Sequence, residues 1–486
     1  MKISILHISD IHKAAKDKYD YLLSSLALDY EKYKEEGITP PQLIVVSGDI
    51  IQGSGSLDIE TANKEIAQQY TDASFFLEEL CSLFLKGNKA RIVIAPGNHD
   101  VNRAIAMKSM KKMQVSPTDN KNMAKELWRS GSNIRWNWED LSFYKIENTE
   151  LYNSRFDNFC NFYSDFYEQK RSYNIDPEKQ SSIIDFEEFN LAVVDFNSCN
   201  NLDNLNTSGC IHPSCLVSIS TELRKLHNKG RLIIGVWHHH VNGLPCENNY
   251  LDKRILSQMI NNHINLGIHG HQHVCGIINE YKDFFDERKL PLISAGTLYG
   301  GSKELPYGAK RQYNVIEIEY KLDSTEIVVH SREDKSHSCF EFIDWGKGNI
   351  ETLELGKNII QIPVIRQPSI DSVINEINRE AELSKDYSKA INSLLKYDTN
   401  NPFVQKTILH YAQMNNDNEF ILSFLDNPTT IDEAIILLDC VSELMDISKI
   451  ENVLKIPFIA ESKNASIEYK KNELQFYIKT KKNGKY

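Results

Sequence analysis

The sequence lacks the features that mark membrane and secreted proteins. No apolar run approaches the roughly 18 residues that a membrane-spanning helix needs, and the strand-like runs at 43–47 and 232–236 are short. The opening residues, MKISILHISDIH, contain one lysine and no small-residue cleavage site, so we interpret them as a strand and not as a secretion signal. The nine cysteines include no Cys-x-x-Cys pair, which favours free thiols in a reducing compartment. We therefore expect a cytoplasmic protein without membrane contacts.

An overall excess of positive charge is also absent. Lys plus Arg total 55 against 67 for Asp plus Glu, a net charge of −12, which excludes a surface that attracts nucleic acid everywhere. Residues 101–136 are a local exception, with eight cationic and two acidic side chains and a net charge of +6. The cationic residues are Arg103, Lys108, Lys111, Lys112, Lys121, Lys125, Arg129 and Arg135, and Trp128, Trp136 and Trp138 lie within or beside the segment. Such a run is more often a solvated helical face than a nucleic-acid groove, although tryptophans beside cations also hold single strands.

Short apolar runs alternate with helix-like stretches at the start of the chain. Runs at 3–9, 42–49 and 90–96 are separated by helix-like stretches at 19–36 and 62–85. Because the runs are continuously apolar, we expect parallel strands that are buried on both faces. Later strand-like runs predict a hairpin and a second sheet packed on the first, with helices outside; they lie at 182–198, 231–237, 265–269, 291–296, 314–320, 326–331 and 340–345.

The length of 486 residues exceeds what one hydrophobic core supports, so we expect two domains. The first covers residues 1–345 and contains a helical, basic insert or cap at 101–182. A linker at 346–368 then leads to a mainly helical domain at 369–486, which we interpret as a protein-interaction module. The last stretch, 464–486, is lysine-rich and predicts a strand or a basic tail. No fixed-period repeat is evident, although helix pairs of the solenoid type fit the pattern.

Chemically capable residues follow the ends of the predicted strands. Asp10, Asp49 and Asn98 follow the first three strands, and the histidine runs at 238–240 and 271–273 follow two later ones. The carboxyl ends of parallel strands are where α/β proteins build their sites. Carboxylates, an amide and imidazoles together suit divalent cations such as Mn²⁺, Fe²⁺ or Zn²⁺. On an extended backbone, residues i and i+2 point to the same side, so we expect each Asp-x-His or His-x-His pair to face the cations together.

These residues resemble the five sequence blocks of the calcineurin-like metallophosphoesterase superfamily. The blocks occur in the family's order: Asp10-x-His12, Gly48-Asp49, Gly97-Asn98-His99-Asp100, His238 and Gly270-His271-x-His273. The resemblance covers about residues 1–345 and depends on the whole set. It implies an α/β two-sheet sandwich flanked by helices and a metal-dependent phosphoesterase that uses two divalent metal ions, with Mn²⁺ preferred over Fe²⁺ or Zn²⁺.

The resemblance also implies roles for individual residues. One metal ion would be held by Asp10, His12, Asp49 and His273, and the other by Asp49, Asn98, His238 and His271. A hydroxide that bridges the ions would attack the phosphorus, and His99 would protonate the leaving group with Asp100 orienting its ring. Within the run 238–240, an alignment shifted by one residue would select His239 in place of His238.

Residues beside the motifs favour one branch of the superfamily. The protein serine/threonine phosphatase branch has Gly-Asn-His-Glu and Asp-Arg-Gly, whereas this chain has Asp100 and the sequence Ile-Ile-Gln-Gly at 50–53. We therefore expect hydrolysis of a phosphodiester, with DNA or RNA slightly ahead of a small nucleotide because of the basic insert. Two alternatives stay open. In the first alternative, the protein is a small-molecule phosphatase or a cyclic-nucleotide phosphodiesterase. In the second, it is a sensor or scaffold subunit of a multi-protein complex and acts through its C-terminal helices.

Overall fold

The chain forms two compact units, Met1–Gln367 and Pro368–Tyr486. The structure is a computed structural model that describes residues 2–14, 19–116, 118–129, 131–243, 248–283, 286–300, 305, 309–321, 324–336, 343–352, 358–363, 370–397, 399 and 401–483. The first unit contains every residue of the sequence motifs.

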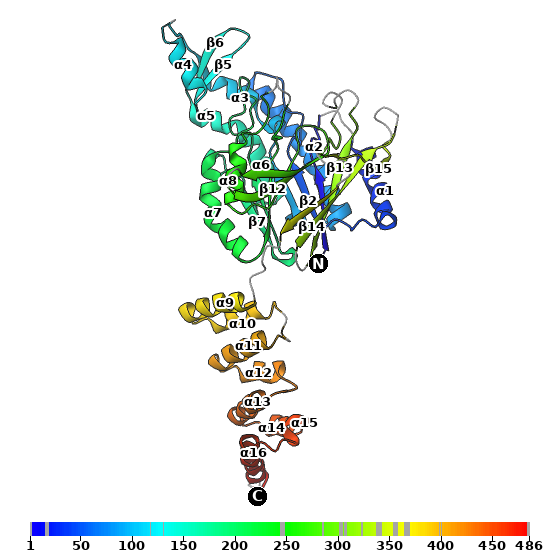
Figure 1. Ribbon diagram of the computed structural model, residues 1–486, viewed down its shortest axis with the longest axis vertical. Helices are drawn as coiled ribbons and strands as arrows, with labels where there is room; N and C mark the ends of the chain where they lie inside the picture. Colours follow the sequence, from blue (N-terminus) through cyan, green and yellow to red (C-terminus); the bar gives the residue numbers. More distant parts are fainter. Residues whose placement is uncertain are drawn as a thin grey trace. The chain divides into compact units, whose positions relative to one another are not determined.

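The first large sheet of this unit has the strand order β15-β14-β13-β1-β2-β3, and β17 pairs with β14 (Figure 1). The strands are β1 (Lys2–Ile8), β2 (Leu43–Ser47), β3 (Ile92–Ala95), β13 (Gln312–Tyr320), β14 (Ser324–Asp334), β15 (Trp345–Lys347) and β17 (Ile359–Pro363). β1, β2 and β3 run parallel, and β13 is antiparallel to β1 with Ile316 opposite Ile5. The carboxyl ends of the three parallel strands therefore share one edge of the sheet.

The second large sheet has the order β16-β11-β12-β10-β9-β8-β7. Its strands are β7 (Ser181–Phe186), β8 (Leu191–Phe196), β9 (Leu232–Val236), β10 (Leu266–His269), β11 (Gly276–Asp283), β12 (Asp286–Ser294) and β16 (Glu351–Thr352). β8, β9, β10 and β12 are parallel, while β7 and β8 form the predicted hairpin. This sheet likewise gathers the carboxyl ends of its central strands at one edge.

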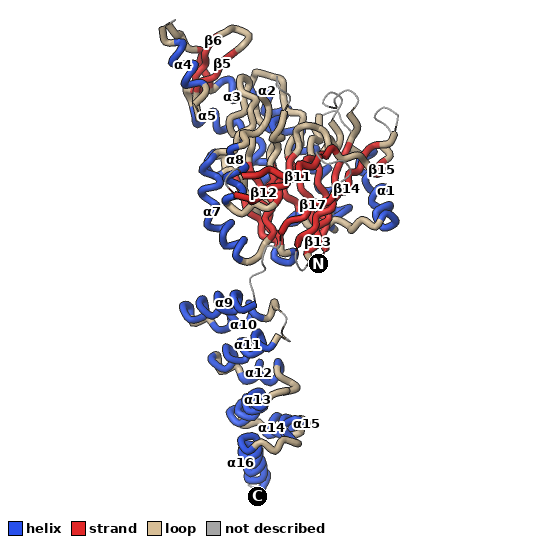
Figure 2. Tube along the Cα trace, in the orientation of Figure 1, coloured by secondary structure: helices blue, strands red, loops and turns tan. Residues whose placement is uncertain are grey.

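The two sheets pack face to face and are covered by helices on their outer faces (Figures 1 and 2). Along β1, Ile3 and Ile5 face the space between the sheets, whereas Leu6 and Ile8 lie under the outer helices. The covering helices are α1 (Asp20–Glu36), α2 (Ile59–Leu85) and α6 (Asp157–Phe166) on one sheet and α7 (Pro213–Asn228) and α8 (Arg254–Asn261) on the other. Continuous apolar strands are therefore buried on both faces, and the expected α/β two-sheet sandwich is confirmed.

The insert at 101–182 is only partly helical. It contains α3 (Arg103–Lys108), β4 (Met110–Lys112), α4 (Asn120–Leu127), β5 (Ile134–Asn137), β6 (Ser142–Ile146), α5 (Thr149–Asn153) and α6. β4, β6 and β5 form a small antiparallel sheet, so the expectation of a purely helical cap is wrong. The reason is the alternation of aromatic and β-branched residues in 134–137 and 142–146, which favours strands over the helix indicated by the charge run.

The expected linker at 346–368 instead belongs largely to the sandwich. Within it, β17 pairs with β14 and β16 with β11, and the division between the two units falls after Gln367. Ile360 and Ile362 are buried in the core between the large sheets, which explains why this piece folds back onto the first unit. Of the strand expected at 340–345, residues 340–342 lie outside the described residues, and the strand begins at Trp345.

The second unit is helical. Its helices are α9 (Ile370–Ser384), α10 (Tyr387–Leu394), α11 (Pro402–Met414), α12 (Asn418–Phe424), α13 (Ile431–Leu444), α14 (Ile447–Leu454), α15 (Pro457–Ala460) and α16 (Ala465–Asn483). The stretch from 464, expected as a strand or tail, is the helix α16. Ile467 and Leu474, two turns apart, are buried in the core of this unit and stabilise the helix.

The second unit also contains a repeat that is weak in the sequence. Asp386, Asp417 and Asp446 cap the N-termini of α10, α12 and α14, and they are 31 and 29 residues apart. Each carboxylate accepts a hydrogen bond from a backbone N–H of the first turn. Successive helix pairs with this spacing are typical of a solenoid.

Across the part of the chain that the structure describes, no helix combines the length and apolar character needed to cross a membrane.

A buried carboxyl in the second sheet makes stability depend on pH. Asp195 of β8 is fully buried and accepts hydrogen bonds from the backbone N–H and the hydroxyl of Ser182, at 3.1 and 2.7 Å. Burial raises the pKa of Asp195 to about 7. The folded state therefore keeps a proton that the unfolded chain has lost, and stability falls as pH rises from about 4 to about 7.

We predict that Asp195→Asn removes this dependence. The free energy of unfolding of the variant relative to the native chain should increase by about 2–3 kcal/mol between pH 5 and pH 8. Denaturant titration at the two pH values measures the difference, and Glu139→Gln on the exposed surface is the control. An Asp195→Asn effect that is the same at both pH values would contradict the prediction.

Candidate metal centre

The structure brings all seven predicted ligands together at the carboxyl ends of parallel strands. Asp10 and His12 follow β1, Asp49 follows β2 and Asn98 lies just beyond β3. From the second sheet, His238 follows β9, and His271 and His273 follow β10. The five residues up to His238 are buried, and the last two are partly exposed. The candidate site therefore lies where the strand ends of both sheets meet.

Most of these residues have an unusual backbone. Five have a left-handed φ: Asp10 (54°), His12 (50°), Asp49 (52°), His271 (78°) and His273 (59°). The expectation that each pair lies on an extended backbone is therefore wrong, and the side chains converge through tight left-handed turns. Such conformations cost roughly 1–2 kcal/mol per residue, although Asp and His tolerate them better than β-branched residues do. Strain of this kind clusters at functional sites.

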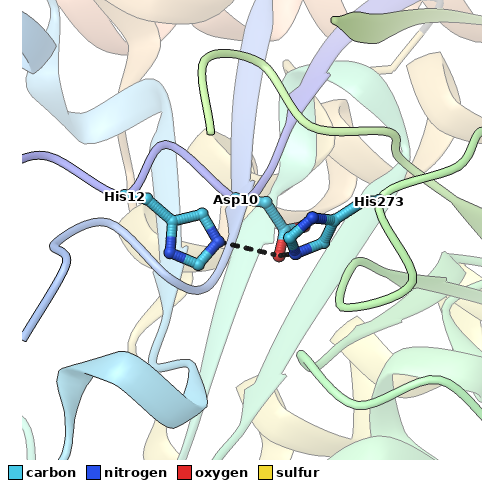
Figure 3. A group of neighbouring side chains, drawn as sticks. All are labelled: Asp10, His12 and His273. Carbon is cyan, nitrogen blue, oxygen red and sulfur yellow. Dashed lines mark ion pairs between the residues drawn. The ribbon is translucent and has the colours of Figure 1, made fainter. Parts of the chain in front are cut away.

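One group of side chains surrounds the carboxylate of Asp10. Asp10 Oδ1 is 3.2 Å from His273 Nε2 and 3.7 Å from His12 Nε2, and Figure 3 shows the carboxylate oxygen between the two rings. The ligand atoms of these three residues lie within 4.8 Å of one another. Among the described residues, Asp10 Oδ1 and both ring nitrogens of His12 make no hydrogen bond despite being buried. Buried polar atoms that converge without hydrogen bonds fit a cation between them.

A second group surrounds Asp49 and Asn98. His238 Nε2 lies 3.1 Å from Asp49 Oδ2 and 2.9 Å from Asn98 Oδ1, and His271 Nδ1 is also 2.9 Å from Asn98 Oδ1. Asp49 Oδ2 is 3.8 Å from His12 Nε2 as well, so this carboxylate lies between the two groups. Two further groups also have ligand atoms within 4.8 Å of one another: His12 with Asp49 and His99, and Asp10 with Asp49 and His238. Asp49 belongs to both of these groups, and the division of the other residues between two cations stays a prediction. Carboxylate, amide and imidazole donors in this number fit two divalent cations of intermediate softness.

The geometry favours His238 over its two neighbours as a ligand. His238 Nδ1 lies 2.8 Å from the carbonyl oxygen of Ser47, so Nδ1 donates, and the Nε2 atom that faces Asp49 is the one that a cation would bind. His239 is directed elsewhere, with its Nδ1 2.9 Å from Ser198 Oγ. His240 Nδ1 lies 2.7 Å from the carbonyl oxygen of Asn242. His239 is thus tied to Ser198, and its ring centroid lies 4.7 Å from that of His271.

Two motif glycines allow the backbone to approach the ligands closely. A Cβ atom on Gly97 would overlap the backbone nitrogen and Oδ1 of Asp49. A Cβ atom on Gly270 would overlap the side chain of Ser9 and crowd Asp10. These glycines are needed because the strand ends pack directly against the carboxylates.

Charges in the centre are paired before any cation binds. Burial disfavours ionisation of Asp49, but His238 and His99 outweigh it, so the pKa of Asp49 is lowered. Burial likewise disfavours the charged form of His238, but Asp49 outweighs it and raises the pKa of His238 to about 9. A divalent cation would replace the proton on His238, so metal binding should release protons and strengthen with pH.

His99 lies beside the centre, but Asp100 does not contact its ring. His99 Nδ1 lies 2.8 Å from the carbonyl oxygen of Gln52. The His99 ring is edge-on to the His12 ring, with 4.6 Å between the ring centroids. Asp100 instead accepts hydrogen bonds from the backbone N–H of Gly97 at 2.7 Å and from the hydroxyl of Tyr70 at 2.9 Å. The expectation that Asp100 orients His99 is therefore corrected. His99 and His238 each contact a main-chain carbonyl oxygen, of Gln52 and Ser47 respectively. Every residue has such a carbonyl, so the sequence gives no signal for these two contacts.

A family model and two solved structures are similar to this chain. A family model described as calcineurin-like phosphoesterase matches residues 3–275, more than half of the chain. Among solved structures, a dimetal phosphatase from Danio rerio is similar at 13% identity, with 67% of this chain and 95% of that chain covered and a TM-score of 0.36. The calcineurin-like phosphoesterase YfkN from Bacillus subtilis is similar at 13% identity, with 80% and 99% covered and a TM-score of 0.26. A search of curated proteins gave no match.

The histidine run provides a test of the ligand set. We predict that His238→Asn loses one of two bound Mn²⁺ ions, because its Nε2 faces Asp49 and Asn98, whereas His239→Asn and His240→Asn keep both. Elemental analysis of dialysed protein gives the metal content, and thermal unfolding with added Mn²⁺ gives the linked stabilisation. Loss of metal in His239→Asn, with His238→Asn unaffected, would reverse the assignment.

Proposed function

Because the chain belongs to the calcineurin-like phosphoesterase family, whose model matches residues 3–275, we propose that it hydrolyses phosphodiester bonds of a nucleic-acid strand. Family membership makes the protein a metal-dependent phosphoesterase. The choice of a nucleic-acid diester rests on one observation. The basic insert begins with α3 immediately after the motif residues Asn98, His99 and Asp100. Substrate held by the insert would therefore lie beside the centre.

The seven side chains would hold the cations in two sets that share Asp49. When bound, two divalent cations activate water at neutral pH and neutralise charge on the phosphoryl oxygens. We propose Mn²⁺ as the native metal and Fe²⁺ or Zn²⁺ as substitutes, because four imidazoles in the set favour these over Mg²⁺ or Ca²⁺. The buried carboxylates of Asp10 and Asp49 provide the negative charge for the ions.

We propose that His99 is the proton donor to the leaving group. A carbonyl oxygen only accepts hydrogen bonds, so the contact of Nδ1 with Gln52 fixes the hydrogen on Nδ1. Nε2 is then the atom that can hold the transferred proton. Burial lowers the pKa of His99, which makes the protonated ring a stronger acid. Asp100 contributes indirectly, because its bonds to Gly97 and Tyr70 shape the turn that carries His99.

The charges of the folded insert support a polyanionic substrate, although less strongly than the sequence run does. Ion pairs occupy part of the run: Lys112–Asp140 at 2.9 Å, Arg135–Asp203 at 2.7 Å, Arg129–Glu126 at 3.6 Å and Lys111–Glu147 at 3.8 Å. Lys108, Lys121, Lys125 and Lys145 are exposed and have no acidic partner within 4 Å among the described residues. Residues 101–147 still carry nine cationic and five acidic side chains, a net charge of +4 in an acidic protein. The phosphates of a nucleic acid could therefore contact these four lysines.

The second unit supports an additional role in binding a protein partner. Solenoids of helix pairs present extended surfaces, and Phe403, Tyr469 and Phe476 of this unit are 62%, 65% and 73% exposed.

We also propose that the protein is cytoplasmic. The support is that the cysteines of the described residues, Cys81, Cys160, Cys199, Cys210, Cys215, Cys275 and Cys440, are free thiols.

The proposed acid can be tested through the leaving group. His99→Ala should keep both metal ions but lose roughly 10²–10⁴-fold in kcat on diesters with an alkoxide leaving group, and much less with p-nitrophenolate, which needs no proton. Steady-state kinetics on thymidine and p-nitrophenyl diesters, with metal content measured in parallel, checks this. Equal losses on both substrates together with missing metal would make His99 a ligand instead.

The substrate class can be tested with the Mn²⁺ enzyme. We predict that oligonucleotides have a higher kcat/KM than cyclic nucleotides or phosphomonoesters, and that this advantage shrinks with added salt. Lys121→Glu with Lys125→Glu on α4 should lower the ratio of oligonucleotide to bis-p-nitrophenyl phosphate kcat/KM. Higher activity on cyclic nucleotides, with the ratio unchanged in the double variant, would favour the small-molecule alternative.

A further inference from the structure

The insert contains a cavity of about 520 Å³ between α4 and the face of the small sheet. Met123 of α4, Met113 beyond β4 and Ile134 of β5 provide its apolar lining. Arg129 and Lys145 supply cationic groups, and Glu126 lies beside Arg129 at 3.6 Å. Its volume is in the range of small-ligand sites and suits a single nucleotide. Flexible methionines line sites that accept flat rings of differing shape.

The small sheet places a second cation, Lys111, next to the cavity residue Lys145. Lys111 of β4 lies directly opposite Lys145 of β6 in the register, so the two ammonium groups share one face of the sheet. Directly opposed like charges destabilise a strand pair. The only acid near Lys111 in the described residues is Glu147, at 3.8 Å with both side chains more than half exposed, which is a weak offset. A bound anion would relieve this repulsion.

Two exposed tryptophans flank the cavity elements. Trp128 at the end of α4 is 87% exposed, and Trp138 at the end of β5 is 79% exposed. Trp138 stands edge-on to Trp136 at 5.9 Å, and Trp136 packs on Phe143 at 4.7 Å, so the outer ring is supported by an aromatic cluster. Exposed rings beside free cations are the surfaces on which unpaired bases stack.

We propose that this cavity binds one nucleotide of a single-stranded nucleic acid as it passes from the metal centre. The base lies on Met113, Met123 and Ile134, and the flanking phosphates contact Arg129 and Lys145. Glu126 favours a nucleotide over a bare phosphate, because its carboxylate repels a phosphate but accepts hydrogen bonds from a base amino group. Base pairs keep their rings stacked inside the duplex, so a single strand offers a base to the cavity without the cost of unpairing and unstacking it. This inference rests on the proposed nucleic-acid substrate.

Buried contacts fix the insert to the metal-bearing unit. Arg135 of β5 donates to Asp203 at 2.7 Å, and the hydroxyl of Tyr152 donates to the same carboxylate at 2.9 Å. The loop that carries Asp203 begins beside Ser198, whose hydroxyl contacts His239 next to the candidate ligand His238. Only 11 residues separate Asp100 from Lys111, so the cavity lies at most about 40 Å along the chain from the centre. A strand of about a dozen nucleotides is therefore long enough to reach both places.

The experiment compares Arg129→Ala/Lys145→Ala with Arg224→Ala/Lys225→Ala, a matched pair of exposed cations on α7. Fluorescence anisotropy in the His99→Ala background measures binding of labelled 12-mers of dT, rU and duplex DNA. The cavity variant should bind both single strands at least tenfold more weakly, and the α7 variant should bind like its parent. Tighter binding of the duplex than of the single strands, or unchanged 12-mer binding by the cavity variant, would overturn the proposal.

Hydrolysis separates this inference from the proposed function. In the Mn²⁺ enzyme, the ratio of 12-mer to bis-p-nitrophenyl phosphate kcat/KM should fall at least tenfold in the cavity variant, while the corresponding ratio for a dinucleotide stays constant. If the native chain cleaves 12-mers and the cavity variant cleaves them equally well, the cavity proposal fails and the function stands. If the native chain cleaves bis-p-nitrophenyl phosphate but no oligonucleotide, both fail. Thermal unfolding of each variant verifies that the small sheet is intact.

Discussion

The carboxylate of Asp49 is the contact on which the rest of the centre depends. Its Oδ1 accepts the backbone N–H of His99 at 2.8 Å, and its Oδ2 lies 3.1 Å from His238 Nε2. One side chain thus joins the end of β2 to the turn after β3 and to the strand end of the opposite sheet. Gly97 has no side chain because Asp49 occupies the space that a Cβ would take. Moving this carboxylate would disturb both groups of ligands at once.

Packing within the sandwich stabilises the strained backbone and the buried polar groups of the centre. Five left-handed residues and several buried polar atoms that make no hydrogen bond among the described residues all oppose folding. They persist because the strands that precede them are buried on both faces and hold the strand ends in place. Binding of cations would offset part of this cost, since a cation would bind a ring nitrogen of His12 that makes no hydrogen bond.

Sequence reasoning predicted the sandwich, the hairpin and the convergence of the motif residues, because continuous apolar strands and a complete motif set leave few alternatives. It did not find the left-handed turns at Asp10 and His12, since no periodic pattern encodes them. It also misjudged Asp100, whose partner Tyr70 comes from a distant helix. The run of charges in the insert favoured a helix, so its strands were not predicted. Arg135, one of the cations counted in that run, is buried against Asp203. Regular packing was predictable, whereas single long-range contacts were not.

The proposed function requires that Asp49 contact two cations. The most direct measurement is an anomalous difference map of crystals grown with Mn²⁺, collected at the manganese edge. We expect two peaks about 3.5–4 Å apart, with Asp49 touching both, Asp10, His12 and His273 around one, and Asn98, His238 and His271 around the other. A single peak, or two peaks of which Asp49 touches only one, would contradict it.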